Sequence, residues 1–174
     1  LNGAGFEAYV VGGCVRDALL DRWPHDWDIC TSALPQQVID CFPDCAVHPT
    51  GIQHGTVLVV QESEGVEATT FRTEAGYSDH RHPDQVTFVR SVEEDLGRRD
   101  FTINAMAYHP DCGIVDPFGG RLDLERKMIR CVGMPEERFE EDGLRILRAL
   151  RFAARYGFVI EPETARAMDQ CRRS

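Results

Sequence analysis

The stretch AYVVGGCVRDALLDRWPHDWDICT, residues 8–31, decides the fold of this chain of 174 residues. Its first four residues are apolar and predict a short buried strand. Gly12 and Gly13 follow, and the next eight residues predict a helix with Arg16 and Asp17 in its first turn. Two glycines at a strand-to-helix junction let backbone N–H groups approach an anion, and the start of a helix favours negative charge. The stretch therefore predicts a phosphate-binding turn.

The end of the same stretch carries two carboxylates. Trp23-Pro24 ends the helical pattern, and the strand-like run behind it places Asp26 and Asp28 at alternate positions. Residues two apart on a strand point to the same side, so the two aspartates share one face. Mg²⁺ takes hard oxygen ligands, often one or two carboxylates together with substrate phosphates. The stretch as a whole predicts a magnesium–triphosphate site, although a Gly-Gly turn or an Asp-x-Asp pair alone is also typical of ordinary surface loops.

The composition is that of one ordinary domain, or of one domain with a fragment of a second. Hydrophobic residues make up 43% of the chain, which is enough for a core. No apolar run reaches the ~18 residues of a membrane helix, and no signal-peptide pattern occurs. The seven cysteines lack C-x-x-C spacing. We interpret them as reduced, mostly buried thiols and expect a cytoplasmic protein with no membrane contact.

Charge is divided unevenly along the chain. The net charge of −10 argues against nucleic-acid binding by the chain taken whole. Residues 1–125 carry 8 arginines against 21 acidic residues, whereas residues 126–174 carry 10 arginines and one lysine against 8 acidic residues. The acidic first part fits metal binding or merely a soluble surface. Eighteen arginines against one lysine suit phosphates and base edges, although a biased genome composition gives the same ratio.

Two strands and a possible third acid follow the aspartate pair. Residues 56–61 are a β-branched apolar run, and residues 66–72 (VEATTFR) predict the strand that returns after a polar turn. Glu67 falls in the middle of the second strand, where a carboxylate is costly to bury without a partner. It is either a third acid beside Asp26 and Asp28 or an exposed strand residue, and spacing alone leaves both open.

The segments around these strands predict loops and short elements. Residues 73–85 (TEAGYSDHRHPDQ) have no periodicity and predict a long mobile loop, which is often functional in a compact domain. Ser91, with Glu94 three residues later, has the pattern of a capping box. The further expected elements are a loop at 45–51, short helices at 36–42, 91–96, 122–127 and 162–171, and short strands at 86–89, 114–115 and 129–132.

A pair of arginines precedes the next expected helix. The apolar spacing of residues 103–107 predicts that helix, with Asp100 or Thr102 as its cap. Arg98 and Arg99 stand directly before it and would attract phosphate at its start. An ordinary solvated basic pair is the alternative.

Residues 136–156 predict one long helix that Gly157 ends. At 100° per residue, its apolar and basic residues separate onto two faces. One face carries Phe139, Ile146, Leu147, Leu150, Ala153 and Ala154, and the other carries Arg145, Arg148, Arg151 and Arg155. An amphipathic helix with a solvated basic face is the ordinary interpretation. Leu144 and Phe152 interrupt the arginine face, however, so we expect that face to meet another part of the protein or a phosphate.

Six motifs follow one another along the chain: GGCVRD, the pair in Asp26-Trp27-Asp28, VEATTFR, EEDLGRRDFTINAMA, DPFGG and RFEEDGLRILRALRF. In this order they resemble the class II tRNA nucleotidyltransferase/poly(A) polymerase family and are most similar to bacterial CCA-adding enzymes. The resemblance covers nearly the whole chain and implies an α+β fold. Residues 1–132 would form a polymerase-β-type nucleotidyltransferase head, a small mixed sheet with helices. Residues 133–174 would begin an all-helical neck, and the family's body and tail domains would be absent from this chain.

The resemblance also implies a role for each matching residue. Asp26 and Asp28 match carboxylates that bind two Mg²⁺ ions, and Glu67 matches a third acid that assists the primer 3′-hydroxyl. The residues that match nucleotide contacts are Gly12, Gly13 and Arg16 at the triphosphate, Arg99 and Asp100 at the sugar, and Asp142, Arg145, Arg148 and Arg151 in the neck motif E-D-x-x-R-x-x-R.

Asp142 and Arg145 resemble the pair that reads the base of CTP or ATP without a nucleic-acid template. Cytosine and adenine both offer an exocyclic amine and a ring-nitrogen acceptor, whereas uracil and guanine present the opposite pattern. A carboxylate that accepts from the amine and an arginine that donates to the ring nitrogen fit both permitted bases. The i, i+3 spacing places the two side chains next to each other on the expected helix.

The predicted function is addition of CCA to the 3′ end of tRNA from CTP and ATP, by two-metal phosphoryl transfer with release of pyrophosphate. The full-length loop at 73–85 favours complete CCA addition, because family members that add only CC tend to have a shorter one. A poly(A) polymerase, or an A-adding or CC-adding enzyme, is the alternative within the family. A non-catalytic nucleotide-sensing module is more remote because all three acids are present, and a Rossmann-type binder would need G-x-G-x-x-G.

Overall fold

A mixed sheet forms the centre of the computed structural model, which describes residues 1–171. Within those residues the sheet has seven strands in the order β3-β4-β5-β2-β1-β8-β9. Only β2 and β5 pair in parallel among these neighbours. The strands are β1 (Ala8–Val11), β2 (Trp27–Thr31), β3 (Ala46–Gly51), β4 (Thr56–Gln61), β5 (Glu64–Thr70), β8 (Ala107–His109) and β9 (Gly113–Val115). The α+β fold class with a small mixed sheet is confirmed.

Helices and two small ribbons surround this sheet. The helices are α1 (Gly13–Leu19), α2 (Pro35–Cys41), α3 (Val92–Gly97), α4 (Gly120–Glu125), α5 (Pro135–Glu141), α6 (Leu144–Tyr156) and α7 (Pro162–Cys171), with single 3-10 turns η1 (Asn2–Ala4), η2 (Ile52–His54) and η3 (Thr102–Asn104). One ribbon pairs β6 (Arg72–Ala75) with β7 (Gln85–Phe88), and the other pairs β10 (Met128–Ile129) with β11 (Val159–Ile160). None of the described helices is long and apolar enough to cross a membrane.

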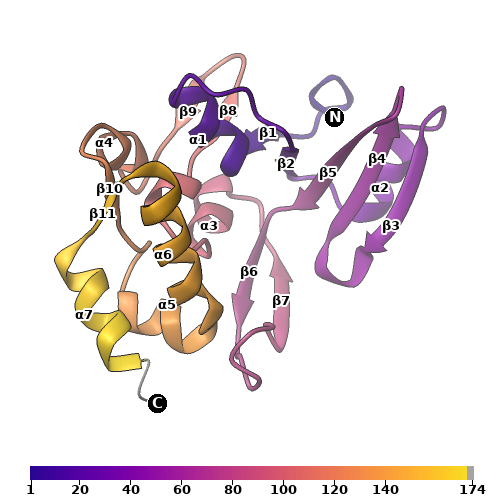
Figure 1. Cartoon of the computed structure of the whole chain (residues 1–174). Coiled ribbons are helices and arrows are strands. Elements are labelled where there is room, and N and C mark those ends of the chain that lie inside the picture. Colours follow the sequence, from indigo (N-terminus) through magenta and orange to yellow (C-terminus); the bar gives the residue numbers. More distant parts are fainter. Residues whose placement is uncertain (172–174) are drawn as a thin grey trace.

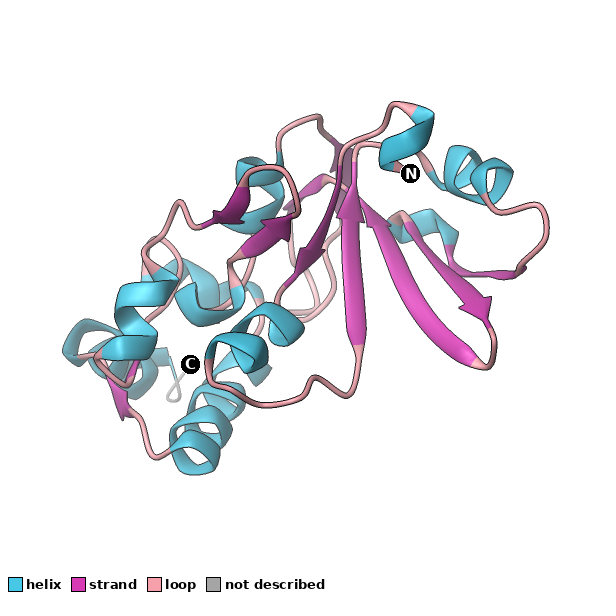
Figure 2. Cartoon of the chain, turned by 90° about the horizontal axis from the view of Figure 1, so that it is seen from above, coloured by secondary structure: helices cyan, strands magenta, loops and turns pink. Residues whose placement is uncertain are grey.

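The elements divide the molecule into two ends. Figure 1 shows α5, α6 and α7 at one end, α2 with β3 and β4 at the other, and the β6–β7 hairpin between them. Seen from above in Figure 2, the long strands fan out at one end, whereas most helices gather at the opposite end. One hydrophobic cluster joins Val15 of α1, Phe101, and Phe152 of α6. The last helices are therefore packed onto the first part of the chain through a shared core.

Two segments that the sequence predicts as loops are strands. Residues 46–51 pair with β4 at the edge of the sheet, with a register shift next to Pro49 that an edge strand tolerates. Residues 72–75 and 85–88 pair as a hairpin, so only its tip remains a loop. The strand β6 escaped prediction because its sequence is polar, and its charged side chains Arg72 and Glu74 form an ion pair at 2.7 Å.

The prediction of a helix at residues 103–107 is wrong. Residues 102–104 form one 3-10 turn, and Ala107 already begins β8. The backbone N–H of Thr102 donates to Arg130 (2.9 Å), and its hydroxyl donates to the buried carboxylate of Asp123 (2.5 Å). These long-range bonds replace the local bonds of a helix, and spacing along the chain gives no sign of them.

The single helix expected at residues 136–156 is also wrong, because it is broken at Asp142 and Gly143. Asp142 has extended backbone angles (φ −145°, ψ 103°), and its Oδ1 accepts from the N–H of Leu144 at 2.9 Å. Asp142 lies one residue before the N-cap, Gly143, and this bond gives a partner to one of the free N–H groups at the start of α6. Glycine within a helix costs about 1 kcal/mol relative to alanine, which favours a break at this position.

The arginine side of α6 meets another part of the protein, as predicted, through Arg145 and Arg148, but much of the leucine side is exposed. Leu144, Leu147 and Leu150 are exposed, with 62% of Leu147 accessible, whereas Arg145, Ala149 and Phe152 are buried. The inner side of α6 lies between the two predicted faces: Ile146 and Ala153 of the apolar set pack against the core, whereas Arg151 and Arg155 are exposed. Arg145 and Arg148 turn inward because each has a carboxylate partner there, described below.

The remaining expectations hold with small shifts. Strands at 8–11 and 56–61 and a helix at 162–171 have the expected bounds. The hydroxyl of Ser91 accepts from the N–H of Glu94 (3.3 Å) at the start of α3, as the capping pattern predicts. All seven cysteines are free, but the prediction that most are buried is wrong: only Cys14, Cys30 and Cys131 are buried.

Candidate active site

The turn between β1 and α1 lies next to the aspartate pair. Gly12 has a φ of 81°, a backbone conformation that favours glycine, and a Cβ atom there would lie 2.9 Å from Nη1 of Arg99. The N–H of Gly12 donates to the carbonyl of Met106 at 3.0 Å, so that N–H already has a partner within the protein. Gly13, one residue on, lines the cleft itself. The absence of a side chain at Gly12 therefore lets Arg99 lie directly against the turn before α1.

Asp26 and Asp28 project into the cleft beside this turn. Asp26 lies directly before β2 and Asp28 is the second residue of β2, so both reach the same side of the strand. Burial raises the pKa of Asp28, Arg99 opposes this shift, and the negative charge of Asp26 adds to it. Two neighbouring like charges, one of them half-buried, make a place where a cation is favourable.

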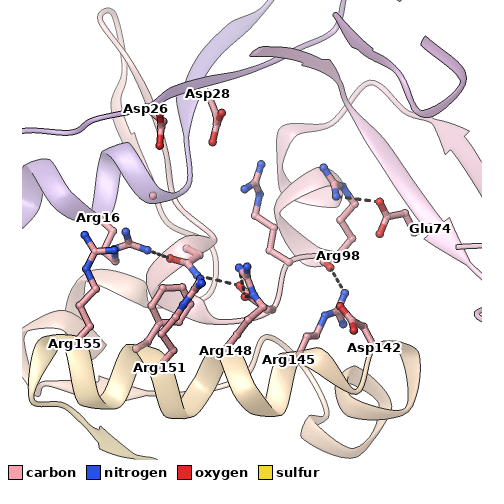
Figure 3. Close-up of a pocket in the computed structure, with 15 residues that line it drawn as sticks. Arg16, Asp26, Asp28, Glu74, Arg98, Asp142, Arg145, Arg148, Arg151 and Arg155 are labelled. Atoms are coloured by element: carbon pink, nitrogen blue, oxygen red, sulfur yellow. Dashed lines mark hydrogen bonds and ion pairs between the residues drawn. The ribbon is translucent and has the colours of Figure 1, made fainter. Parts of the chain in front are cut away.

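The arginines of α6 form the opposite wall of the cleft. Figure 3 shows Asp26 and Asp28 on one side, and Arg145, Arg148 and Arg151 rising from α6 on the other. The cleft has a volume of about 550 Å³. It is lined by Gly13, Arg16, Asp26, Asp28, Glu74, Arg98, Arg99, Asp100, Asn104, Asp142, Arg145, Arg148, Arg151, Phe152 and Arg155. Most of the residues that the sequence predicts for the site therefore meet in one place.

Arg145 is held by its surroundings and is only 8% exposed. Its Nη1 donates to Glu141 at 2.5 Å and to the carbonyl of Arg138 at 3.1 Å. Its Nη2 donates to the carbonyl of Arg98 at 3.4 Å. Burial lowers the pKa of Arg145, but the bond and charge of Glu141 outweigh burial and leave that pKa raised. The acidic partner of Arg145 is Glu141, the last residue of α5. It is not Asp142, whose extended backbone interrupts the helix.

Arg148 pairs with Asp100 across the cleft floor. Its Nε and Nη2 lie 2.7 and 2.6 Å from Oδ2 of Asp100. The other carboxylate oxygen of Asp100 accepts from the N–H of Phe101 (2.7 Å) and from Nδ2 of Asn104 (3.1 Å). Both oxygens of Asp100 therefore have partners within the protein, and the carboxylate has one fixed orientation.

Arg151 and Arg155 differ from their neighbours on α6. Neither has a carboxylate within ion-pair distance among residues 1–171. Their guanidinium groups lie over aromatic rings instead, 5.4 Å from the centre of Phe152 for Arg151 and 5.4 Å from the centre of Tyr156 for Arg155. Such contacts hold the cation by attraction to the ring face and leave its N–H donors for an anion.

Glu67 lies outside the cleft between the aspartate pair and α6, here called the main cleft. It is exposed on β5, directly beside Asp28 in the parallel register of β2 and β5. A second cleft, of about 390 Å³, is lined by Asp26, Trp27, Asp28, Leu58, Gly65 and Glu67. The aspartate pair thus belongs to two clefts, and the three acids meet only in the second one.

The base of the β6–β7 hairpin forms an ion network beside the main cleft. Arg98 lies 3.1 Å from both Glu74 and Asp95, and Asp95 is fully buried. Asp95 also accepts from the backbone N–H of Arg72 at 3.1 Å. The network fixes Arg98, whose carbonyl accepts from Arg145.

Several residues of the cleft were not predicted as site residues. They are Glu74, Arg98, Asn104, Phe152 and Arg155. Arg98 was expected only as part of a phosphate-attracting pair, and Arg155 only as part of the arginine face of a helix. Asn104 lies within the quoted motif RRDFTINAMA but carries no charge signal. Glu74 lies in a segment that predicts a loop, and only the hairpin pairing brings it to the cleft.

Comparison with known protein families gives a match over most of the chain. Residues 8–130 match the family described as the Poly A polymerase head domain. The chain belongs to this poly(A) polymerase head family. The matched residues run from the first strand of the sheet to just beyond β10.

Two curated relatives are highly similar to this chain. It is 57% identical over 167 residues to the CCA-adding enzyme of Limosilactobacillus fermentum, covering 96% of this chain and 41% of that enzyme. It is 55% identical over 174 residues to the CCA-adding enzyme of Leuconostoc citreum, covering 100% of this chain and 43% of the relative. The chain thus spans about two fifths of the length of these curated relatives.

Solved structures agree with this family assignment. The Bacillus stearothermophilus CCA-adding enzyme in complex with CTP superposes with a TM-score of 0.87 at 49% identity, over 98% of this chain and 40% of that chain. A tRNA nucleotidyltransferase complexed with a primer tRNA and an incoming ATP analogue superposes with a TM-score of 0.79 at 35% identity, over 99% of this chain and 48% of that chain. The poly(A) polymerase head fold is therefore present with its surrounding helices.

Proposed function

We propose that this chain is the nucleotide-selecting and nucleotidyl-transferring part of a CCA-adding enzyme, which extends the 3′ end of tRNA with CMP and AMP and releases pyrophosphate. The observation that carries the proposal is the main cleft, where two aspartates face a row of arginines. A nucleoside triphosphate needs carboxylate-held metal at its reacting phosphate and cationic donors along the rest of its phosphates. The high identity to CCA-adding enzymes supports the same reaction here.

We propose that Asp26 and Asp28 bind Mg²⁺, with two ions in the reacting complex. The donors fit, because both are carboxylates and the like charges of the pair are unfavourable without a cation. Mg²⁺ bound there supplies neutralisation of phosphate charge and a lower pKa for the attacking hydroxyl. The arginines of the cleft orient the nucleotide: Arg16, Arg99, Arg148 and Arg151 donate to phosphate and sugar oxygens, in the space that Gly13 leaves open.

The second cleft is proposed as the place of the tRNA 3′ end. It shares Asp26 and Asp28 with the main cleft, so an acceptor hydroxyl there and a triphosphate in the main cleft approach the aspartates from two sides. Glu67 lies at this junction and is proposed to assist the 3′-hydroxyl by accepting a hydrogen bond from it. This arrangement brings both reactants to one pair of carboxylates, which lowers the entropic part of the barrier.

Asp142 and Arg145 are proposed to read the base. Asp142 uses Oδ1 to accept from the N–H of Leu144, and its Oδ2 remains to accept from the exocyclic amine of cytosine or adenine. Arg145 uses Nη1 for Glu141, so its Nε and one N–H of Nη2 remain to donate to a ring nitrogen. A fixed arginine rejects a base that presents a donor there, because two N–H groups would then face each other.

We further propose that residues 1–132 act as the head and residues 133–174 as the first part of the neck of a cytoplasmic enzyme. The strands β10 and β11 pair across that boundary, and α6 contributes Phe152 to the core. The two parts would therefore move together during the reaction rather than as separate bodies.

The test is Mg²⁺-dependent labelling of tRNA whose CCA end has been removed. Because the chain spans about two fifths of its relatives, the assay uses a chimera that carries this chain in place of the matching part of the L. fermentum CCA-adding enzyme. Labelling from CTP and ATP together that yields complete CCA ends supports the proposal. ATP-only tails of many residues would instead indicate a poly(A) polymerase, and incorporation of a single nucleotide type would indicate a CC-adding or A-adding enzyme. Binding of CTP without transfer would favour a nucleotide-sensing module.

A further inference from the structure

Arg16 is enclosed on almost every side, although it belongs to the open cleft. Only 6% of its surface is exposed. Its Nε and Nη2 both lie 2.9 Å from Oδ1 of Asp17, and its Nη1 donates to Oδ1 of Asn104 at 2.5 Å. Its guanidinium carbon lies 5.2 Å from the ring centre of Phe152 and 5.1 Å from that of Tyr156. Groups from both ends of the chain thus surround this one side chain.

The pairing of Arg16 with Asp17 is not a result of helix geometry. Adjacent residues on a helix point about 100° apart, and i, i+1 side chains do not face each other. Something outside α1 must therefore hold the carboxylate of Asp17 against Arg16. The hydroxyl of Tyr156, at the end of α6, donates to the same Oδ1 of Asp17 at 3.1 Å. Burial raises the pKa of Tyr156, and Asp17 adds to this shift although Arg16 opposes it, so the hydroxyl keeps its proton.

The ring of Tyr156 is itself held in place. It stacks on Phe152 with ring centres 6.1 Å apart and an interplanar angle of 22°, and it lies 5.6 Å from the ring of Phe158. Arg22, which follows α1, lies over the same ring at 5.0 Å. The hydroxyl therefore projects from a rigid aromatic group, and its bond to Asp17 can fix a flexible carboxylate.

We infer that Tyr156 is a positioning residue for phosphate binding, because its hydrogen bond fixes Asp17 and thereby sets the orientation of Arg16 in the cleft. This inference rests on the proposed function, in which Arg16 contacts the triphosphate. Asp17 and Asn104 together use three of the five N–H donors of Arg16, which leaves one on each terminal nitrogen. Those two donors can grip one phosphate group. An arginine already held in that orientation loses less conformational freedom on binding.

The first test measures the arginine without any nucleotide. In the ¹H–¹⁵N spectrum of the chain, the Nε–H signal of Arg16 is assigned by its loss in Arg16→Lys. Its exchange with solvent is expected to be about tenfold faster in Tyr156→Phe, which keeps the ring and removes only the hydroxyl. Tyr108→Phe is the control, because Tyr108 is exposed on β8, outside both clefts. Unchanged exchange in a folded Tyr156→Phe chain overturns the inference.

The second test separates the phosphates from the rest of the nucleotide. Binding of CTP and of CMP is measured by calorimetry with Mg²⁺ present. We expect Tyr156→Phe to weaken CTP binding about three- to tenfold and to leave CMP binding within about twofold, because one hydrogen bond acts only through the arginine. An equal loss for both ligands indicates a general structural role and contradicts the inference.

Asp17→Asn provides a second route if Tyr156→Phe folds poorly. It keeps an acceptor for the tyrosine but weakens the pair with Arg16, so the same selective loss of CTP binding is expected. If Tyr156 acts through Asp17, the double variant binds CTP no worse than Asp17→Asn alone, whereas additive losses contradict the inference. A wild-type chain that shows protected Arg16 exchange but no CTP binding would refute the proposed function and leave the positioning of Arg16 by Tyr156 established.

Discussion

The two walls of the cleft use their apolar and charged side chains differently. In the β1–α1–β2 segment, residues 8–31, Val11 and Val15 are buried together with one arginine, Arg16, and Asp26 and Asp28 reach the cleft at the start of β2. The α5–α6 segment, residues 135–156, buries Arg145 and exposes three leucines. The difference teaches that an amphipathic pattern shows how two faces are separated, but partners elsewhere in the fold decide which face lies inside.

The largest expected effect comes from the β1–α1–β2 wall, which carries the two aspartates. Replacing Asp28 by Ala in the chimera should reduce CMP incorporation on the order of a thousandfold or more, because the carboxylate that would hold the metal is lost while the strand remains. Asp26→Ala should behave in the same way. Incorporation is measured by labelling of trimmed tRNA.

The control for this prediction is Asp111→Ala, because Asp111 is 90% exposed in the β8–β9 turn. It should retain normal incorporation. Mg²⁺-dependent incorporation at the wild-type rate in both cleft variants would refute the assignment of the aspartate pair. Thermal unfolding of each variant shows whether the fold is intact.

The next prediction tests directly which side of α6 is buried. Ala149→Glu should destabilise the chain by about 3–5 kcal/mol, since it forces a charge and extra volume into a closed core. Leu147→Glu, two residues away, should change stability by about 0.5 kcal/mol or less, because that position is exposed. Urea unfolding of the two variants gives both values. A larger loss for Leu147→Glu would mean that the leucine face is the inner one, as the periodicity alone suggests.

The same helix shows what sequence alone can give. The motifs predicted both walls of the cleft by residue, and the apolar runs at 8–11 and 56–61 predicted strands with the observed bounds. The break at Gly143 was not predicted, because a single glycine in an otherwise periodic stretch is tolerated by many helices. Only the second strand of the hairpin at 72–88 was predicted, because β6 is polar and its Glu74 finds its partner Arg98 far along the chain. Local sequence signals are strong in the β1–α1–β2 wall, whereas the structure of the α5–α6 wall depends on contacts between distant residues.

A smaller effect is expected for base selection by the α5–α6 wall. Arg145→Ala in the chimera should relax discrimination against UTP and GTP by roughly ten- to a hundredfold, the range for loss of one good base-edge contact. The ratio of kcat/KM for CTP to that for UTP measures this change. Arg166→Ala on α7 is the matched control, because its side chain is exposed. A folded Arg145→Ala enzyme with wild-type selectivity would exclude the base-reading role.

The smallest effect concerns the hairpin that joins the two walls, where Glu74 lies 2.7 Å from Arg72 and 3.1 Å from Arg98. Burial raises the pKa of Glu74, but the two arginines and the hydroxyl of Tyr77 outweigh burial and leave that pKa below its ordinary 4.5. A carboxyl group whose pKa is lower in the folded state stabilises the fold above its unfolded pKa and loses this contribution as the pH falls through the folded value. The free energy of unfolding should therefore decrease below about pH 4.5, and it should decrease less in Glu74→Gln. Urea unfolding between pH 7 and pH 3.5 measures both slopes, with Glu163→Gln as the exposed control. If Glu74→Gln and wild type have the same acid slope, Arg98 is held by Asp95 alone, and the hairpin contributes no charge to the positioning of Arg145.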